Sequence, residues 1–312
     1  MLKEFTKKVI NRGKQFYKDK GKYSLIDRSS GSEKMCYILS GYKEYLWDIV
    51  FERIAAFVPK DVDVCIVYSG GMGKTTDLEQ IAEKYEWSYL ATKRNQLCLS
   101  QNIVLQIFDQ AKYIYKLDED MFVTKEFFTQ TWQTLERVKR EGRYAVGLVS
   151  CLTPVNGYGY IPLLKKYGKL EEYEKKYGKA FYSGGGENDA VLFNSEFPFF
   201  IQNIPELKNI DLLSKRLSQE EFSYSICPTR YNIGAILFER ELWEKMGHFD
   251  VSLGGCGLGQ DEGQMCKHIM ERSRVIVIAE NCAVGHFGYS IMVNKEWIAY
   301  YQTHKEEFEI TQ

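Results

Sequence analysis

The sequence predicts an α/β fold in which helices cover both faces of a mostly parallel sheet. Apolar segments suited to buried strands, such as residues 62–68 and 144–151, alternate with segments of helical periodicity, such as 76–86 and 125–140. This alternation is typical of parallel sheets, because each pair of parallel strands needs a crossover that usually contains a helix. One long segment, residues 152–226, interrupts the alternation and is predicted to be a largely helical insertion.

The individual elements follow from apolar runs and apolar stripes. The helix expected at 42–58 carries a stripe at helical spacing, and Pro59 ends it. The strand at 62–68 contains the run VCIV, and a helix at about 76–86 follows it. By the same criteria the remaining elements are strands at 87–92, 112–118 and 144–151, helices at about 98–110 and 125–140, a strand running into a short helix within 233–250, the helix DEGQMCKHIMERS, the strand RVIVIAE and a final polar helix.

Composition divides the chain into four segments. These are a basic N-terminal segment and linker at 1–40, one half of a domain at 41–151, the helical insertion at 152–226, and a second half of the same domain at 227–312. The insertion is rich in Tyr, Gly, Lys and Glu and contains little continuous apolar sequence. Long insertions of this kind often shape binding sites.

Composition and charge exclude several classes of protein. The 312 residues are 45% hydrophobic, which fits a globular domain, and carry a formal net charge of −1, so the molecule as a whole lacks the excess positive charge typical of nucleic-acid-binding proteins. No apolar run reaches the roughly 18 residues of a membrane span, and the N-terminus lacks the apolar core of a signal peptide. Eight scattered cysteines without a CxxC pair are typical of reduced thiols. We therefore expect a soluble cytoplasmic protein.

The basic N-terminal segment allows two interpretations. Leu2, Phe5, Val9 and Phe16 lie at near-helical spacing among many lysines and arginines. An amphipathic helix of this kind either docks its apolar stripe on the domain or lies on an anionic membrane surface. The second interpretation would make the protein peripheral to the membrane.

Acidic residues follow the apolar strand expected at 112–118. In LDEDMFV, Asp118 and Asp120 are separated by one residue at the end of this strand. Two carboxylates at such a place suit a hard cation such as Mg²⁺ or Mn²⁺, which can also bind a diphosphate. The alternative is a solvated acidic turn or an N-cap for the helix at 125–140.

Two further motifs lie in the last quarter of the chain. In GLGQDEGQMC, Asp261 and Glu262 begin a helix directly after a glycine-rich loop, where the helix N-terminus favours carboxylates. The alternative is that Asp261 only caps this helix. His286, in AVGHFGYS, follows the last predicted strand and is either a metal ligand or a structural histidine.

In their order along the chain these motifs resemble those of family 2 glycosyltransferases with the GT-A fold. The resemblance covers residues 62–290 and leaves the middle insertion unmatched. GAILFERELWEKMGHFD is similar to a strand and helix of the family's acceptor half, and DEGQMC stands where the family has Glu-Asp-x-x-Leu-Cys. Upstream, Asn95 and Asn102 match the asparagines of the family's N-x-G-x-x-x-R-N helix entry, with Gln101 in place of arginine.

The resemblance implies an inverting, metal-dependent glycosyltransferase. It would move a sugar from a nucleotide-diphosphate sugar, with a UDP-sugar as the first choice, to a hydroxyl group of a carbohydrate or glycoconjugate acceptor. Polysaccharide or glycoconjugate synthesis is the family's common setting. Residues 41–151 would then be the donor half, and residues 227–312 the acceptor and catalytic half.

The resemblance also implies the residues of the metal site and the general base. Asp120 and His286 would hold Mn²⁺ or Mg²⁺ on the diphosphate, with Asp118 bound directly or through water. The base is either Glu262, by its register in the motif, or Asp261, by its residue type.

The same resemblance places the donor nucleotide beside Ser69, Asp118 and Gln101. Because Gln101 replaces the family's arginine, Lys93 or Arg94 would supply the missing positive charge.

The stretch at residues 69–76 offers an alternative function. SGGMGKTT resembles the P-loop variant of partition-type ATPases, although Ser69 stands where that variant has lysine and Tyr68 where a P-loop begins with glycine. A P-loop-like ATPase would use Lys74 to bind phosphate. A non-catalytic carbohydrate-binding module of the same fold is the third possibility.

Overall fold

The computed structural model describes residues 23–70, 75–155, 158–182, 189–252, 256, 258–288 and 295–311. Contacts divide the chain into two compact units. The first comprises Met1–Trp47, Pro59–Glu119 and Leu237–Ser273, and the second comprises Asp48–Val58, Asp120–Ile236 and Arg274–Gln312.

The strands of the first unit are mostly parallel. Their bounds are β1 (Tyr23–Ile26), β2 (Lys34–Ser40), β3 (Val62–Tyr68), β4 (Ser88–Thr92) and β5 (Tyr113–Asp118), and they lie in the order β1-β4-β3-β2-β5. β2 pairs in parallel with β3 and β5, and β3 pairs in parallel with β4, whereas β1 is antiparallel to β4. β2 and β3 are almost continuously buried, as expected for parallel strands covered on both faces.

The register of these strands brings their carboxyl ends to one edge of the sheet. Ser40 lies opposite Tyr68, and Leu39 lies opposite Asp118. Tyr68 also lies opposite Ala91, near the end of β4. Ligands of open α/β sheets bind beyond this edge, so a site in the first unit is expected where β2 to β5 end.

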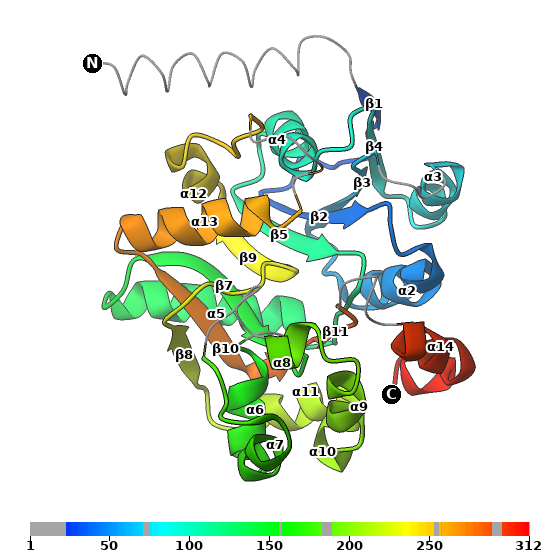
Figure 1. Ribbon diagram of the computed structural model, residues 1–312. Coiled ribbons are helices and arrows are strands. Elements are labelled where there is room, and N and C mark those ends of the chain that lie inside the picture. Colours follow the sequence, from blue (N-terminus) through cyan, green and yellow to red (C-terminus); the bar gives the residue numbers. More distant parts are fainter. Residues whose placement is uncertain are drawn as a thin grey trace. The chain divides into compact units, whose positions relative to one another are not determined.

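Helices cover both faces of the strands of the first unit. Their bounds are η1 (Glu44–Leu46), α3 (Thr75–Lys84), α4 (Leu97–Ile107), α12 (Arg240–Lys245) and α13 (Gln260–Glu271). Figure 1 shows α3 on one side of β3 and β4 and α4 on the other, and both helices contact these two strands. The crossover from β3 to β4 and the crossover from β4 to β5 run in opposite directions along the sheet. Right-handed crossovers therefore place their helices on opposite faces.

A buried arginine ties the end of α4 to α12. The Arg240 guanidinium donates hydrogen bonds to the carbonyl oxygens of Leu105, Phe108 and Ala111. The last carbonyls of a helix lack partners within the helix, so a cation here satisfies them and also interacts favourably with the helix dipole.

Residues 23–40, predicted to belong to a basic segment and linker, form strands β1 and β2 instead. The SSGS stretch between them is held by Asp63, whose carboxylate accepts the backbone N–H groups of Ser30, Gly31 and Ser32. The sequence did not indicate β2 because MCYILS is short and contains one β-branched residue.

The second unit is built on strands β7 (Val146–Leu152), β8 (Tyr224–Cys227) and β10 (Val275–Ala283). β10 pairs in parallel with β7 and antiparallel with β8. A separate two-stranded ladder joins β6 (Met121–Phe122) to β11 (Gly285–His286). In the chain, β9 (Ala235–Glu239) leads from the second unit into the first.

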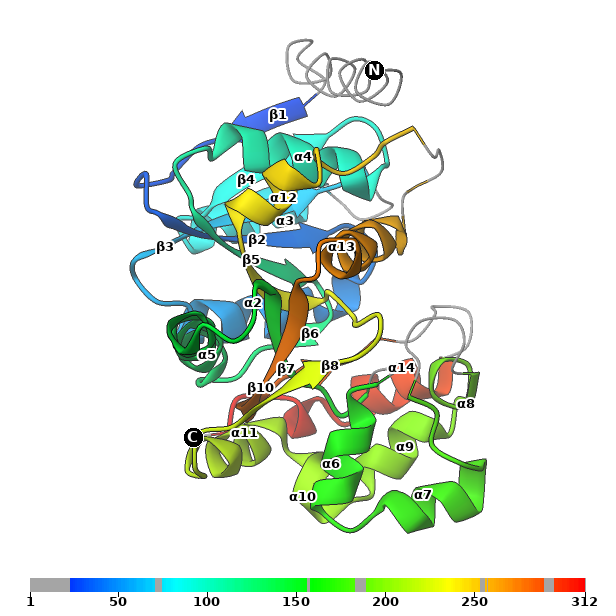
Figure 2. The same ribbon diagram turned by 90° about the vertical axis from the view of Figure 1, so that its left-hand side faces the viewer.

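Helices make up most of the rest of the second unit. Their bounds are α2 (Trp47–Phe57), α5 (Phe127–Glu141), α6 (Tyr160–Lys166), α7 (Leu170–Tyr177), α8 (Asp189–Leu192), α9 (Phe197–Gln202), α10 (Pro205–Lys208), α11 (Ile210–Ser218), α14 (Lys295–Thr303) and η3 (Lys305–Glu307). α5 packs on β7 and β10, and α11 packs on β10. α6, α7, α9 and α10 lie together in the segment at 160–208 (Figure 2), which confirms the predicted helical insertion.

Arg53 in α2 is fully buried and links three distant segments of the second unit. Its guanidinium donates to the carbonyl oxygens of Val123 at 3.0 Å and Phe308 at 2.9 Å, and it forms an ion pair with Asp211. Breaking a buried ion pair by removing one partner typically costs about 3–5 kcal/mol. Arg53 therefore fixes α2, α11 and the segment around Phe308 to one another.

The structure confirms the predicted α/β fold and its mostly parallel strands. The predicted elements between residues 62 and 152 also agree with the observed ones to within a few residues at each end. These strands are predictable because parallel strands that are covered on both faces are continuously apolar.

Candidate active site

In the first unit, the loop after β2 is held by Glu119. The Glu119 carboxylate accepts the backbone N–H groups of Gly41 and Tyr42, both at 2.8 Å, and Nε1–H of Trp47 at 2.6 Å. A buried carboxylate is tolerated when donors satisfy it in this way. The middle residue of the acidic triplet therefore has a structural role that the sequence did not predict.

Tyr42 links the loop after β2 to the loop after β4. Its hydroxyl lies 2.5 Å from Oδ1 of Asn95. Gly70, at the end of β3, has a φ of +75°, and a Cβ atom there would lie 2.7 Å from the backbone nitrogen of Asn95. Both the positive φ and the close approach require glycine. The loops that follow β2, β3 and β4 thus meet at the carboxyl edge of the strands.

Three of the residues predicted to bind the nucleotide lie in these loops. Ser69 is fully buried, and its Oγ has no hydrogen-bond partner within the described residues. Lys93 and Arg94 follow β4 and are exposed, and a Cβ atom added to Gly70 would lie 2.9 Å from the carbonyl carbon of Arg94. The structure thus brings Ser69 to the loop that carries both predicted cations.

Gln101, the fourth predicted nucleotide residue, lies inside the protein. Its side chain is fully buried in α4, where Oε1 accepts the hydroxyl of Tyr37 at 2.8 Å. Its Nε2 donates to Oδ2 of Asp261 at 2.8 Å and to the carbonyl of Leu97 at 3.3 Å. With both ends of its amide engaged, Gln101 holds Asp261 and has no atom exposed to a nucleotide.

Asp261 and Glu262 begin α13 but differ in their surroundings. The Asp261 side chain is 4% exposed and accepts the hydrogen bond from Gln101, whereas Glu262 is half-buried. Gly259, whose φ is +71°, is the N-cap residue of this helix. The interpretation of the sequence in which Asp261 caps the helix is therefore wrong. Of the two carboxylates, that of Glu262 is the more accessible.

Asp118, at the end of β5, forms an ion pair with a buried lysine. Lys116 Nζ lies 2.5 Å from Oδ1 of Asp118, and the side chains of Lys116 and Asp118 are 2% and 33% exposed. Burial opposes the charge on Lys116, but the carboxylates of Asp118, Asp261 and Glu262 together raise its pKa above the ordinary lysine value. The sequence carried a signal for this residue, because a lysine inside an apolar strand is rarely buried without a partner.

Asp120 and His286, both in the second unit, are brought together by the short ladder of β6 and β11. His286 lies opposite Met121 in this ladder, and its Nε2 is 3.5 Å from Oδ2 of Asp120. The backbone N–H of Phe287 donates to the carbonyl of Asp120 at 2.9 Å. Two residues that are far apart in the sequence, and that the motif resemblance paired, are therefore neighbours.

A backbone carbonyl orients the His286 ring. Nδ1 lies 3.1 Å from the carbonyl oxygen of Val155. Because a carbonyl oxygen only accepts hydrogen bonds, Nδ1 is the donor in this contact, and Nε2 is the ring nitrogen that faces Asp120. Gly288 leaves room for the ring, since a Cβ atom added there would overlap Cε1 and Nε2 of His286.

This donor set fits a divalent cation that also binds a ligand. One imidazole nitrogen and one carboxylate suit Mn²⁺, which accepts both nitrogen and oxygen ligands. Across the described ranges, no group of three or more His, Cys, Asp or Glu side chains has metal-binding geometry. The pair can therefore supply part of a coordination shell, which a diphosphate and water would complete.

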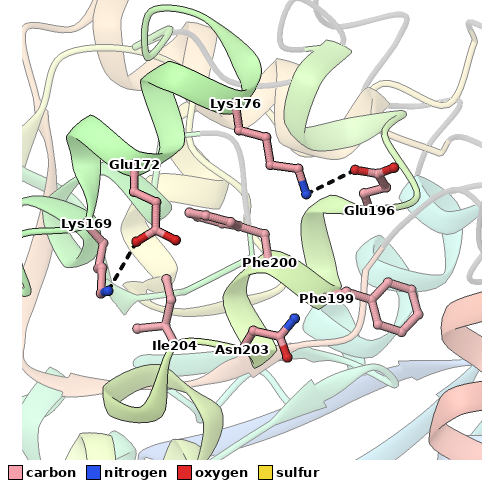
Figure 3. Close-up of a pocket in the computed structure, with 8 residues that line it drawn as sticks. All are labelled: Lys169, Glu172, Lys176, Glu196, Phe199, Phe200, Asn203 and Ile204. Carbon is pink, nitrogen blue, oxygen red and sulfur yellow. Dashed lines mark hydrogen bonds and ion pairs between the residues drawn. The ribbon is translucent and has the colours of Figure 1, made fainter.

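A cavity in the helical insertion contains none of the predicted site residues. It has a volume of about 500 Å³ and lies between α7 and α9 (Figure 3), where it is lined by Lys169, Glu172, Lys176, Glu196, Phe199, Phe200, Asn203 and Ile204. Two ion pairs, each 3.1 Å long, join Lys169 to Glu172 and Lys176 to Glu196. Because these charges neutralise one another, the cavity does not suit a diphosphate.

Two of the sequence hypotheses fall outside the described residues. Lys74 and its neighbours at 71–74 are not described, nor is the basic segment at 1–22. None of the helices in the described part of the chain is both long and apolar enough to cross a membrane. All eight cysteines lie in the described part, and none forms a disulfide.

No protein-family model and no curated protein matches this sequence. Several solved structures are similar to it, all of them at low identity. A mannosyltransferase from Pyrobaculum calidifontis, in complex with GDP-Man and Mn²⁺, has a TM-score of 0.47 and 13% identity over 94% of this chain and 67% of that one. GalNAc-T7 with UDP, GalNAc and Mn²⁺ has a TM-score of 0.49 and 11% identity over 86% of this chain and 46% of that one. TarS from S. aureus in complex with UDP has a TM-score of 0.44 and 10% identity over 82% of this chain and 60% of that one.

Proposed function

We propose that this chain is a GT-A-type glycosyltransferase that moves a sugar from a nucleotide-diphosphate sugar to an acceptor hydroxyl with inversion. The observation that carries the proposal is the pairing of Asp120 with His286, whose Nε2 is oriented by the hydrogen bond of Nδ1 to Val155. A histidine whose second nitrogen is fixed in this way is typical of a metal ligand.

Asp120 and His286 are proposed to hold Mn²⁺ or Mg²⁺, with Asp118 bound directly or through water. When bound, the metal would neutralise negative charge that develops on the leaving diphosphate. Asp118 forms an ion pair with Lys116 at 2.5 Å, and its side chain is 33% exposed.

Glu262 is proposed as the general base, and Asp261 as the residue that positions it. The half-buried Glu262 carboxylate is accessible to an acceptor hydroxyl, whereas Asp261 is buried and hydrogen-bonded to Gln101. Glu262 would take the proton as the acceptor oxygen attacks the anomeric carbon, and the diphosphate would leave from the opposite face. This single displacement inverts the anomeric centre.

The nucleotide is proposed to bind at the carboxyl edge of β2, β3 and β4. Gly41 and Tyr42 there belong to a loop that Glu119 holds in place, and Lys93 and Arg94 add positive charge. Basic side chains at the carboxyl edge of a parallel sheet suit a nucleotide diphosphate. A UDP-sugar is the first donor to test, with a carbohydrate or glycoconjugate as acceptor.

The proposal is tested by a donor screen with the purified full chain. Release of free nucleotide or sugar is followed for UDP-, GDP- and dTDP-sugars with Mn²⁺, with Mg²⁺ and with a chelator. Metal-dependent turnover of one donor is expected. If no donor is bound or turned over with either metal, the proposed activity is excluded, and binding without turnover would favour the carbohydrate-binding module.

A further inference from the structure

Lys116 is a lysine enclosed within an apolar strand. In the β5 sequence YIYKLD its two neighbours, Tyr115 and Leu117, are buried, and the lysine side chain is 2% exposed. Burying an ammonium group in apolar surroundings is unfavourable unless partners compensate it. A hydrophobic residue here would serve the strand equally well, so the position of the charge needs an explanation.

Acidic groups near Lys116 explain why its ammonium group can be buried in β5. Asp118, two residues along β5, forms an ion pair with Lys116 at 2.5 Å. Asp261, at the start of α13, is joined through Gln101 to Tyr37, the sheet neighbour of Lys116. The carboxylates of Asp261 and Glu262 also raise the pKa of Lys116. One buried ammonium group therefore interacts with acidic groups of both β5 and α13.

A chain of neutral hydrogen bonds completes this cluster. Tyr37 in β2 lies opposite Lys116 in the sheet register, and its hydroxyl donates to Gln101 at 2.8 Å. Gln101 in turn donates to Asp261 at 2.8 Å. Burial and the nearby carboxylates of Asp261 and Asp118 raise the pKa of Tyr37 well above its ordinary value, so Tyr37 stays a neutral donor. Lys116 is then the cation that balances the carboxylates.

We infer that Lys116 is a positioning residue for the transfer reaction, because its single buried charge holds Asp118 on the donor side and balances Asp261 and Glu262 on the acceptor side. The inference rests on the proposed function, since it assigns Asp118 to the donor and Glu262 to proton transfer. Without the cation, three carboxylates would repel one another in a partly buried region, where Coulomb interactions are strong.

Two separate effects follow from this arrangement. Loss of the charge at Lys116 should loosen Asp118 and weaken donor binding, and it should also disturb the carboxylates at the start of α13 and slow the transfer step. If Lys116 only stabilised the fold, its loss in the Asp118→Asn variant would not change the transfer step while leaving donor binding unchanged.

The experiment compares Lys116→Met, Asp118→Asn and the double variant in the full chain. Lys116→Met keeps the length of the side chain and removes its charge. Lys112→Met is the control, because Lys112 forms an exposed ion pair with Glu33 near the start of the same strand. Calorimetry with a UDP-sugar and Mn²⁺ gives the donor dissociation constant, and transfer at saturating donor gives kcat.

Lys116→Met alone is expected to weaken donor binding about tenfold, the change expected when a charge-assisted hydrogen bond is lost. In the Asp118→Asn background it should leave donor affinity unchanged but still lower kcat about tenfold or more. The Lys112→Met variant should match the wild type in both measurements.

Other results overturn the inference in recognisable ways. A double variant that equals Asp118→Asn in both donor affinity and kcat would restrict Lys116 to a structural ion pair. Additive losses of donor affinity would show that Lys116 does not act through Asp118. If Lys116→Met alone fails to fold, the comparison of the double variant with Asp118→Asn still tests the inference. The double variant removes the charges of both residue 116 and residue 118, so neither is left unpaired with the other. A wild type that binds no nucleotide sugar would instead overturn the proposed function, and this inference with it.

Discussion

The Nε2 atom of His286 lies 3.5 Å from Oδ2 of Asp120, on a ladder of only two residues per strand. Neither residue belongs to a long element, so their approach depends on the β6–β11 pairing and on the hydrogen bond from Phe287 to the Asp120 carbonyl. This short ladder therefore fixes the distance between the two side chains.

Removing either member of the pair should abolish metal-dependent donor binding. His286→Ala and Asp120→Asn are each expected to weaken binding of a UDP-sugar with Mn²⁺ by at least about tenfold, because each removes a ligand. Calorimetry with and without Mn²⁺ measures this change. His304→Ala is the control, since the His304 ring stacks on Tyr300 at a ring distance of 4.1 Å and its Nδ1 lies 3.0 Å from the Tyr300 carbonyl oxygen. Unchanged donor affinity in both site variants would exclude the metal site.

Adding one methyl group at Gly288 should have the same effect as removing the imidazole. A Cβ atom at this position would overlap the His286 ring, which would have to rotate away from Asp120. We expect Gly288→Ala to remain folded and to lose Mn²⁺-dependent donor binding. The Gly288→Ala/His286→Ala double variant should be no worse than either single variant, because all three lack the oriented ring. A Gly288→Ala protein with normal metal dependence would contradict the ring orientation described above.

Removing the charge of Glu262 should reduce the transfer rate more than removing the charge of Asp261. Glu262→Gln is expected to retain donor affinity and to reduce transfer by at least about 10²-fold, as loss of a general base does. Asp261→Asn should reduce transfer less, because its carboxylate is buried and acts through its neighbours. Initial transfer rates at saturating donor give the answer. A larger loss in Asp261→Asn than in Glu262→Gln would reverse the two assignments.

Glu119 should contribute to stability rather than to chemistry. Glu119→Ala would leave the N–H groups of Gly41, Tyr42 and Trp47 without their acceptor, and each unsatisfied buried donor costs about 1–3 kcal/mol. We expect the free energy of unfolding to fall by at least about 2 kcal/mol in urea denaturation. Glu79→Ala, at an exposed position of α3, is the matched control. A stability loss no larger than that of the control would show that the loop is held by other contacts.

Lys74 separates the glycosyltransferase proposal from the P-loop alternative. Lys74→Ala should leave UDP-sugar binding and transfer within about twofold of the wild type, whereas a P-loop protein depends on this lysine for phosphate contact. Binding of ATP and of the nucleotide sugar to both proteins is measured side by side. Loss of nucleotide binding in Lys74→Ala would favour the ATPase.

Several parts of the fold could be predicted because their signals are local. The strand at Val62–Tyr68 contains the apolar run VCIV with turn residues after the strand, and the helix at Phe127–Glu141 has an apolar stripe and ends at a left-handed glycine, Gly142. β2 could not be predicted in the same way. Its strand character comes from the two parallel neighbours that cover it, which is tertiary context rather than propensity.

The candidate site likewise contains residues that the sequence could identify and residues whose roles depend on tertiary context. Asp120 and His286 were paired by a motif resemblance, and their closeness agrees with it. The roles of Glu119 and Gln101 depend on which groups lie in neighbouring loops, strands and helices, and no spacing in the sequence reports these neighbours. Gln101 illustrates the difference, because its place in a motif suggested a nucleotide contact and its burial makes it a support for Asp261.

The Arg53 contacts also determine which C-terminal truncations the second unit can tolerate. Phe308 lies only a few residues before the last residue of the sequence, yet its carbonyl is an acceptor for a fully buried guanidinium. The backbone N–H of Thr311 reaches the same Asp211 that pairs with Arg53. A deletion that begins upstream of Phe308 would therefore remove an acceptor of the buried Arg53 guanidinium and so disturb the interior of the second unit.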